Sequence, residues 1–394
     1  MHRRTLLKLA SVAPMLTVAG RLAALPQQKP RLLVVFLRGG YDAANLLVPI
    51  GSSFYYEARP TIAVARPSSD AGSALPLNAE WGLHPALRDS IYPLWQKQQV
   101  AFVPFAGTDD LSRSHFETQD NIEMGQSLSG TRNFESGFLG RVSKILNGAQ
   151  PIAFTEQLPL ILRGEREVPN MALKSLAKPA LDERQSAIIA AMYRQTSMAK
   201  TVNEGFDVRA DVMHEMSDEM EAASRSAINT KGFELEARRM AKLMRDKFNI
   251  GFVDVGGWDT HVGEGAGTGY LAGRFEELGR GLASFADAMG PVWKDTVVVV
   301  VSEFGRTFRE NGNHGTDHGH GTVYWVMGGN VRGGRIAGDQ ARVDQPGLFQ
   351  NRDYPVMNEF RAVLGGTFAR MYGLSSGQVA AIFPGATSKE VGLI

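Results

Sequence analysis

The sequence contains no cysteine among its 394 residues. This absence excludes disulfides, thiolate metal sites, iron–sulfur clusters and cysteine nucleophiles. The chain also lacks an excess of positive charge, since 42 lysines and arginines stand against 41 aspartates and glutamates, so nucleic acid is not an expected partner. Hydrophobic residues make up 43% of the chain and charged residues 21%, which is typical of a folded globular protein. Any catalytic or metal chemistry must therefore use oxygen and nitrogen side chains.

Residues 1–24 have the pattern of an export signal. Paired arginines at 3–4 are followed by an apolar run over 9–20 and by two alanines at 23–24. The run is too short to cross a bilayer, which takes about 20 apolar residues, so we expect no stable membrane span. Paired arginines are typical of the twin-arginine route, which predicts a periplasmic or extracellular protein with the translocation machinery as partner. The alternative is an uncleaved anchor or an amphipathic N-terminal helix.

Short apolar runs alternate with helical patterns along the rest of the chain. Such runs are typical of strands buried on both faces of a sheet, and they cover 32–37, 100–105, 249–255, 296–301 and 322–327. The alternation predicts an α/β fold with a mostly parallel central sheet and helices on both faces. We expect a single domain over 30–394, with a helical cap inserted at about 179–228, where no strand-like run occurs.

Polar residues suited to chemistry gather at the ends of these predicted strands. In open α/β sheets, ligands bind beyond the carboxyl ends of the strands. Asp42, the segment 112–115, Asp259 with His261, and Glu303 with Arg306 each follow a run, whereas Asp317, His318 and His320 stand just before the last run. We therefore expect these side chains to meet at one edge of the sheet.

The carboxylates and imidazoles of this group predict a divalent-metal site. Asp259 and His261 are two residues apart, so in an extended segment both point to one side. His318 and His320 repeat that spacing in a glycine-rich loop. Such donors suit one or two divalent ions, with Zn, Mn, Mg and Ca all open. The predicted ligands are Asp42, Asp259, His261, Glu303, Asp317, His318 and His320.

These acids and histidines also have structural interpretations. Glycine-rich loops commonly carry polar turn residues and exposed histidines, and Asp42 after a Gly-Gly pair can form an Asx turn or cap a helix. Glu303 ends an apolar strand, where an unpaired acid is costly to bury. Either a cation or Arg306 must neutralise it.

A Ser-Arg-Ser-His segment supplies candidate catalytic groups. A hydroxyl of Ser112 or Ser114 beside a metal can lose its proton near neutral pH and attack an ester. Arg113 and Arg306 can hold the oxyanion, and His115 adds an imidazole to the same loop. The alternative is a helix start capped by one of the two serines, and both interpretations can hold together because a helix N-terminus favours a nucleophile.

Six ordered motifs resemble those of one family. They are Leu37-Arg38-Gly39-Gly40-Tyr41-Asp42, Gly82-Leu83-His84-Pro85, Ser112-Arg113-Ser114-His115-Phe116, Gly257-Trp258-Asp259-Thr260-His261, Ser302-Glu303-Phe304-Gly305-Arg306-Thr307 and Thr316-Asp317-His318-Gly319-His320-Gly321. The whole mature chain thereby resembles the DUF1501 proteins, exported bacterial proteins that commonly carry twin-arginine signals. That family is similar, more distantly, to the alkaline phosphatase/sulfatase superfamily, whose members bind two divalent metals at the carboxyl edge of an α/β sheet.

The superfamily resemblance implies roles for individual residues. It implies that Asp42 is a metal aspartate and that the nucleophile lies within 112–114. The other implied ligands are Asp259, His261 and either His318 or His320. Glu303 stands where the superfamily has an Asp-His pair, but no histidine follows it here, which puts a second metal in doubt. Without cysteine or a Ser-x-Pro-x-Arg motif, the formylglycine of sulfatases cannot form.

The sequence thus predicts an exported metal-dependent hydrolase of phosphate or related oxyanion esters, on a small-molecule or glycan substrate. The attacking group would be a metal-activated serine hydroxyl or water. The alternative is a periplasmic module that kept the fold and binds metal or glycan without turnover.

Overall fold

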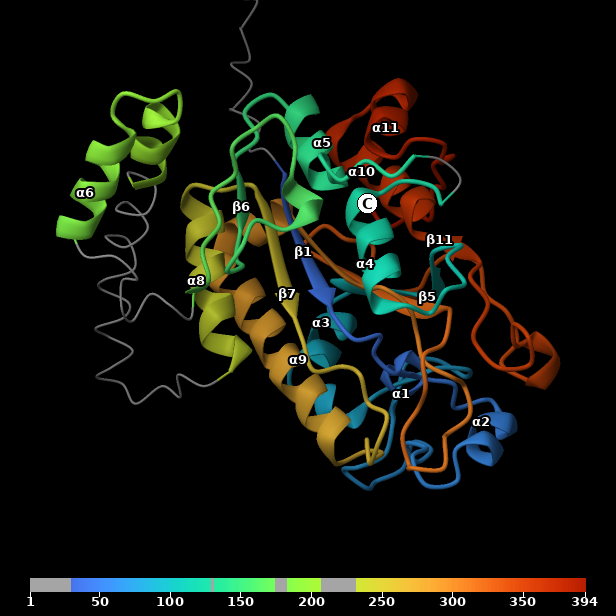
Figure 1. The fold of residues 1–394 in the computed structure, drawn as a ribbon. Coiled ribbons are helices and arrows are strands. Elements are labelled where there is room, and N and C mark those ends of the chain that lie inside the picture. The colour runs from blue at the N-terminus through green and yellow to red at the C-terminus, as the bar shows by residue number, and fades with distance from the viewer. Residues whose placement is uncertain (1–29, 129–130, 174–182, 207–231) are drawn as a thin grey trace, which may run out of the picture.

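A central eight-stranded sheet organises the protein in the computed structural model, which describes residues 30–128, 131–173, 183–206 and 232–394 (Figure 1). Its strand order is β10-β5-β9-β8-β1-β7-β6, and β11 also pairs with β5. The strands are β1 (Arg31–Leu37), β5 (Val100–Gly107), β6 (Pro151–Ala153), β7 (Ile250–Val255), β8 (Thr296–Ser302), β9 (Thr322–Met327), β10 (Arg335–Ile336) and β11 (Asn358–Glu359). A small antiparallel sheet joins β2 (Leu47–Val48), β4 (Gly82–Leu83) and β3 (Leu75–Pro76).

Helices cover both faces of the central sheet. The α-helices are α1 (Ala43–Leu46), α2 (Ser53–Ala58), α3 (Ile91–Gln96), α4 (His115–Met124), α5 (Phe138–Ile145), α6 (Glu183–Tyr193), α8 (Phe233–Asp246), α9 (Tyr270–Met289), α10 (Phe360–Tyr372) and α11 (Ser376–Ile382). Side chains of β1 alternate between two cores: Leu33 and Val35 pack with α8 and α9, and Leu32 and Val34 pack with α5 and α10. This period of two is what a strand buried on both sides requires. The predicted α/β fold is confirmed.

One strand departs from the predicted parallel arrangement in a way that matters for function. β9 runs antiparallel to β5 and β8, whereas β1 pairs in parallel with β7 and β8. Because β9 runs the opposite way, the loop that precedes it lies at the edge where β1, β5, β7 and β8 end. The chain before β9 therefore reaches the same edge as the chain after the other strands.

Two predicted segments lie wholly or partly outside the described residues. The export signal at 1–24 is outside them, and so are residues 179–182 and 207–228 of the predicted helical cap at 179–228. The described part of that cap, 183–206, contains α6, which Figure 1 shows beyond α8 from the sheet. Among the described residues, no helix has both the length and the apolarity needed to cross a membrane.

Candidate functional site: a histidine–aspartate cluster

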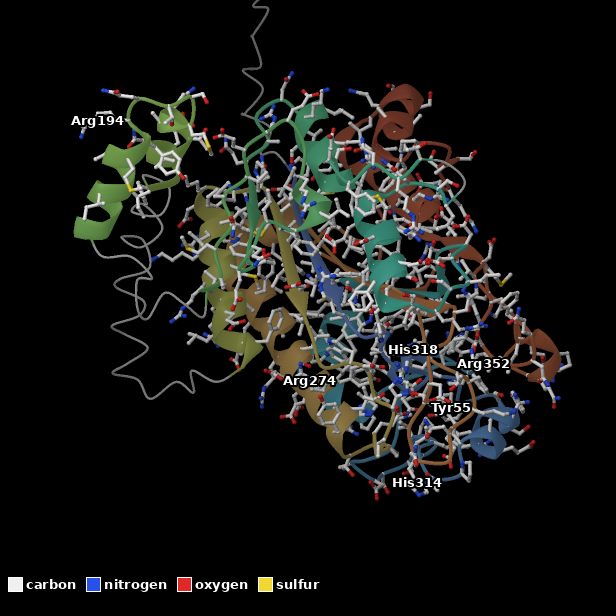
Figure 2. All side chains as sticks on the ribbon, in the orientation of Figure 1. Tyr55, Arg194, Arg274, His314, His318 and Arg352 are labelled. Carbon is white, nitrogen blue, oxygen red and sulfur yellow. The ribbon has the colours of Figure 1, made fainter. Side chains whose placement is uncertain are left out.

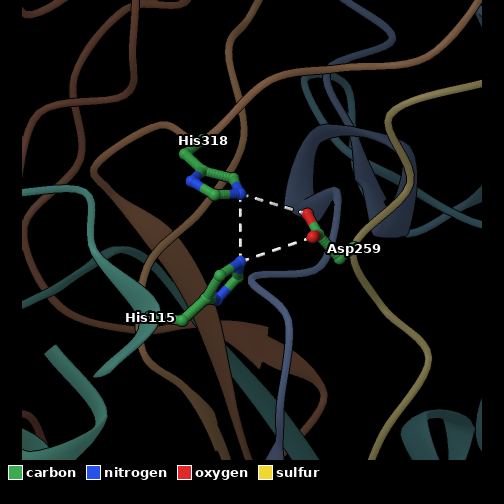
Figure 3. A group of neighbouring side chains, drawn as sticks. All are labelled: His115, Asp259 and His318. Atoms are coloured by element: carbon green, nitrogen blue, oxygen red, sulfur yellow. Dashed lines mark hydrogen bonds and ion pairs between the residues drawn. The ribbon is translucent and has the colours of Figure 1, made fainter. Parts of the chain in front are cut away.

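Three side chains from distant parts of the chain meet at the carboxyl edge of the sheet (Figure 3). His115 starts α4, Asp259 follows β7, and His318 precedes β9. The Nε2 atoms of His115 and His318 are 3.0 Å apart. Asp259 approaches both, with Oδ1 3.2 Å from Nε2 of His318 and Oδ2 3.4 Å from Nε2 of His115. We call these three residues and His261 the donor cluster.

His261 joins the cluster from the side of His318 and Asp259. Its Nε2 lies 3.1 Å from Nε2 of His318 and 2.9 Å from Oδ1 of Asp259. Phe304 packs beneath, with its ring centroid 4.9 Å from that of His115 and 5.1 Å from that of His318. In Figure 2, His318 lies among the loops at the edge toward which the β1 arrow of Figure 1 points, whereas His314 lies farther out.

The second ring nitrogen of each histidine faces an oxygen that can only accept. Nδ1 of His115 lies 2.8 Å from Oε1 of Glu303, and Nδ1 of His261 lies 3.2 Å from Oδ1 of Asp317. Nδ1 of His318 lies 3.0 Å from the carbonyl oxygen of Arg113. Each Nδ1 must therefore carry the proton and donate it. In their neutral forms, the three imidazoles then direct bare Nε2 lone pairs toward one another and toward a carboxylate.

Such an arrangement of neutral imidazoles is repulsive, and a cation between the donors would relieve it. Metal–ligand bonds of about 2.0–2.2 Å place neighbouring donors of one ion roughly 3–3.4 Å apart. The distances among the donor atoms of His115, Asp259 and His318 are 3.0, 3.2 and 3.4 Å, which matches this spacing. Histidine ligands typically donate their other nitrogen to a carboxylate or carbonyl, as all three do here. The donor cluster therefore fits a divalent metal ion.

Hydrogen-bond donors and charged neighbours keep Asp259 and Glu303 ionised. Burial alone would raise the pKa of Asp259, but the hydrogen bond and charge of Arg306 outweigh burial and lower that pKa. Arg306 itself is buried and its Nη1 lies 2.5 Å from Oδ1 of Asp259. Burial likewise opposes ionisation of Glu303, yet hydrogen bonds from His115, Gln119 and the Gly39 backbone lower its pKa. Both carboxylates are thus negative at neutral pH.

The histidine pKa values shift in opposite directions. The hydrogen bond to Glu303 raises the pKa of His115, with burial opposing it. Burial, followed by the charges of His115 and Arg306, lowers the pKa of His318. His318 is therefore held in the neutral form that a metal ligand needs.

Four of the predicted metal ligands lie outside the donor cluster. Glu303 and Asp317 hold the Nδ1 atoms of His115 and His261, behind the donor cluster rather than within it. Asp42 accepts hydrogen bonds from both terminal nitrogens of Arg59, at 2.5 and 3.0 Å, in a fully buried pair. His320 is buried and packs against Phe349, with ring centroids 5.1 Å apart.

The predicted oxyanion clamps are both paired with acids. Nε and Nη2 of Arg113 lie 3.1 and 2.7 Å from Oδ2 of Asp353, and Arg306 pairs with Asp259. Arg306 pairs with Asp259 rather than with Glu303, because its guanidinium reaches across to the loop after β7.

The two candidate serines differ in their surroundings. Ser112 is exposed and its hydroxyl accepts a hydrogen bond from the Ser114 backbone N–H at 3.2 Å. Ser114 occupies the N-cap position of α4, directly before His115, but its side chain makes no capping hydrogen bond. Of the two, the Ser114 hydroxyl is the one that remains free for other contacts among the described residues.

Three residues of the network escaped the sequence analysis. Gln119 lies one turn after His115 on α4, and its Nε2 donates to Glu303 at 2.9 Å; the i, i+4 spacing was the available signal. Arg59 neutralises Asp42, and Glu264 accepts hydrogen bonds from the hydroxyls of Thr260 and Thr316. No local pattern distinguishes Arg59 or Glu264 from surface residues.

The family model described as "Protein of unknown function (DUF1501)" matches residues 29–383, which include every residue of the donor cluster. The chain belongs to the DUF1501 family. No curated protein matches it. The family assignment agrees with the resemblance carried by the six motifs.

Two solved structures are similar at low identity. One is a protein in the alkaline phosphatase superfamily from Vibrio parahaemolyticus, with 13% identity, a TM-score of 0.34, and coverage of 77% of this chain and 61% of that one. The other is Ps i-CgsB in complex with k-i-k-neocarrahexaose, with 9% identity, a TM-score of 0.37, and coverage of 89% and 74%. This DUF1501 chain thus spans less than two thirds of the first of these proteins.

Proposed function

We propose that this protein is an exported metal-dependent hydrolase of phosphate or related oxyanion esters. The observation that carries the proposal is the convergence of three imidazole Nε2 atoms on one carboxylate, each imidazole oriented by an acceptor at Nδ1. A divalent ion bound there would lower the pKa of a hydroxyl or water and polarise the ester. The donor cluster is reachable from solvent, since the Asp259 side chain is 43% exposed.

Each residue of the site would have a separate role in this function. His115, Asp259, His261 and His318 hold the ion, and one or two ions of Zn, Mn, Mg or Ca remain the candidates. Arg306 fixes Asp259 through its short ion pair. The Ser114 hydroxyl, which makes no capping hydrogen bond at the start of α4, is the proposed nucleophile, because a helix N-terminus stabilises the alkoxide. A water in the same place is the alternative.

Metal analysis and an ester panel test this proposal. Protein purified from the periplasm should contain metal in stoichiometric amount and cleave 4-nitrophenyl phosphate, bis(4-nitrophenyl) phosphate or 4-nitrophenyl sulfate. His318→Asn should lower the rate by more than about 100-fold, because it removes a ligand. His314→Asn is the matched control, since His314 is an exposed histidine of the same loop that contacts Thr61 instead. Equal loss in both variants would contradict the assignment.

A non-catalytic metal- or glycan-binding module is the second candidate. The pairing of Arg113 with Asp353 and of Arg306 with Asp259 favours it, because neither guanidinium is free to clamp a transferring oxyanion. Metal-loaded protein that is inert toward the whole panel would support this second function. Full retention of function in Ser114→Ala and Ser112→Ala, with loss in His318→Asn, would also support it.

Export by the twin-arginine route, with the translocation machinery as partner, belongs to the same proposal. The paired arginines at positions 3 and 4 support it. Replacing both with lysine should retain the full-length chain in the cytoplasm, because the route depends on the arginine pair. Cell fractionation followed by immunoblotting measures this, and unchanged export would contradict the twin-arginine route.

A further inference from the structure

The backbone of Arg113, which contacts His318 of the donor cluster, has an unusual conformation. Its φ is +53°, in the left-handed region that only glycine, and less often asparagine or aspartate, enters readily. The arginine side chain has no intrinsic preference for this region, so the conformation costs free energy that other contacts must offset. Strained residues of this kind gather at functional sites. The contacts of Arg113 therefore have to account for its conformation.

The carbonyl group of Arg113 is the acceptor that orients His318. Its oxygen lies 3.0 Å from Nδ1 of His318, although the two residues are 205 positions apart in the sequence. Figure 3 shows that this ring nitrogen of His318 lies on the side away from Asp259, whereas Nε2 faces Asp259 and His115. The direction of a carbonyl depends on the dihedral angles of its own residue. A change of backbone region at Arg113 would therefore turn this acceptor away from His318.

Hydrogen bonds also fix the chain on both sides of Arg113. The Ser112 N–H donates to Oδ1 of Asp110 at 2.8 Å, and the Ser114 N–H donates to the Ser112 hydroxyl at 3.2 Å. His115, the first residue of α4, follows directly. One short stretch of chain thus supplies a histidine of the donor cluster and the acceptor that orients a second histidine.

The guanidinium of Arg113 anchors the residue through its side chain. Nε and Nη2 lie 3.1 and 2.7 Å from Oδ2 of Asp353, and Nη2 also lies 2.9 Å from Oε1 of Gln350. Asp353 is fully buried, and its backbone exchanges two hydrogen bonds with that of Phe349, so it is a fixed acceptor. Charge-assisted hydrogen bonds to a buried carboxylate are strong, and they offset the backbone strain.

We propose that Arg113 is a positioning residue of the metal site. Its side chain, anchored by Asp353, keeps the backbone in the left-handed region, and its carbonyl then directs Nε2 of His318 toward the ion. Arg113 thus acts through its main chain, and its guanidinium does not contact the ester. This inference rests on the metal binding of the proposed function and does not depend on ester hydrolysis.

Three substitutions in the full-length mature protein separate the backbone of Arg113 from its guanidinium, which all three remove. Glycine enters the left-handed region freely, methionine enters it at the usual cost, and β-branched valine is the most strongly disfavoured there. Competition with a chromogenic chelator measures the affinity for the metal alone. We expect Arg113→Gly to bind within about threefold of wild type, Arg113→Met about 3–10-fold more weakly and Arg113→Val about 10–100-fold more weakly, because the support of a ligand is lost.

Gln98 provides the matched control, because it is a second left-handed residue with a long side chain. It has φ +58° and is exposed in the turn before β5, at the opposite edge of the sheet. Gln98→Gly and Gln98→Val should differ in stability by urea denaturation, since only glycine relieves the strain, but both should bind metal like wild type. An affinity difference between them as large as that between Arg113→Gly and Arg113→Val would overturn the inference.

The position of the proton on His318 is a second readout, taken on metal-free protein with isotope-labelled histidine. At mildly alkaline pH, NMR should find the proton of the neutral ring on Nδ1 in wild type and in Arg113→Gly. Arg113→Val should show a larger share on Nε2, because the acceptor at Nδ1 has moved. The spectrum of His318→Asn assigns the signal. A purely structural role of Arg113 would not change this proton position in a folded variant.

Three further results would overturn the inference: equal loss of affinity in Arg113→Gly and Arg113→Val, wild-type affinity in Arg113→Met and Arg113→Val, or an unchanged proton position on His318 in Arg113→Val. Failure of the proposed function gives a different pattern. Wild-type protein that binds no metal contradicts the metal site and this inference with it. Protein that shows the expected order of affinities but cleaves no ester contradicts catalysis alone.

Discussion

Two neighbouring turns in this protein have almost the same sequence and opposite surroundings. β1 is followed by Gly39-Gly40-Tyr41-Asp42, and its parallel neighbour β7 is followed by Gly256-Gly257-Trp258-Asp259. The two aromatic rings are buried and meet edge to face, with centroids 6.0 Å apart. Gly39 has φ +125°, and a Cβ there would lie 2.7 Å from the Asp259 backbone nitrogen, so only glycine lets the turns approach so closely.

The two aspartates then diverge. Asp42 is 1% exposed and is held by Arg59, while the buried Glu264 lies 3.9 Å from the same guanidinium. Asp259 is partly open to solvent and faces three imidazoles as well as Arg306. A buried acid with its own guanidinium has a structural role, whereas an accessible acid among bare imidazole nitrogens can bind a cation. The interaction partners of each aspartate, rather than its local sequence, therefore decide its role.

The largest difference should appear in metal content. Asp259→Asn should reduce bound metal from about one equivalent to less than about a tenth, because it removes the anionic donor of the cluster. Asp42→Asn should keep its metal, because Asp42 is held by Arg59. Elemental analysis of both variants measures this. Loss of metal in Asp42→Asn, with a folded protein by circular dichroism, would show that Asp42 also supports the metal site.

The next largest effect should be on stability. Arg59→Met leaves the buried Asp42 without its cation, which should cost about 3–5 kcal/mol in the free energy of unfolding. Urea denaturation measures it. Arg113→Met, which removes a guanidinium that is partly exposed, should cost less. A loss of stability below about 1 kcal/mol in Arg59→Met would mean that the Arg59–Asp42 ion pair does not stabilise the fold.

A smaller change is expected from the acid behind His115. Glu303→Gln keeps the shape of the side chain but removes the charge that orients Nδ1 of His115, so metal affinity should fall about 10–100-fold. Competition with a chromogenic chelator measures the affinity. Glu310→Gln serves as control, because Glu310 binds Thr61 instead of a cluster histidine. Equal affinity in wild type and Glu303→Gln would show that this hydrogen bond does not support the site.

The smallest effect should come from Glu264. Burial and the charge of Asp42 raise the pKa of Glu264 well above its usual value, which favours its neutral form, so Glu264→Gln should change stability by less than about 1 kcal/mol. A folded-state pKa above the unfolded one means that stability falls as pH rises from the unfolded pKa toward the folded one. Urea denaturation across that range should show a shallower fall in the glutamine variant. A steeper fall would contradict the raised pKa of Glu264.

Much of the fold and part of the site could be predicted from the sequence. The apolar runs predicted the five main strands, and the rule for strand ends predicted the edge where His115, Asp259, His261 and His318 gather. The pattern could not predict that β9 runs antiparallel. It also could not distinguish the residues of the donor cluster from the residues that hydrogen-bond to them. His115 was expected among the catalytic groups, and Glu303 and Asp317 were expected as metal ligands. The role of each of these three side chains depended on which polar atom lay within hydrogen-bonding distance, about 3 Å.

The amino-acid order by itself determined the strands, their glycine-closed ends and the supply of acids and histidines at one edge, because these follow from local periodicity and backbone freedom. Tertiary structure alone decided the assignment of protons and partners. His115 and His318 are 203 positions apart along the chain, yet the lone pair of each is set by an oxygen that only folding brings to its Nδ1. Hydrogen-bond direction acts over a few ångströms of space, and sequence distance carries no information about it.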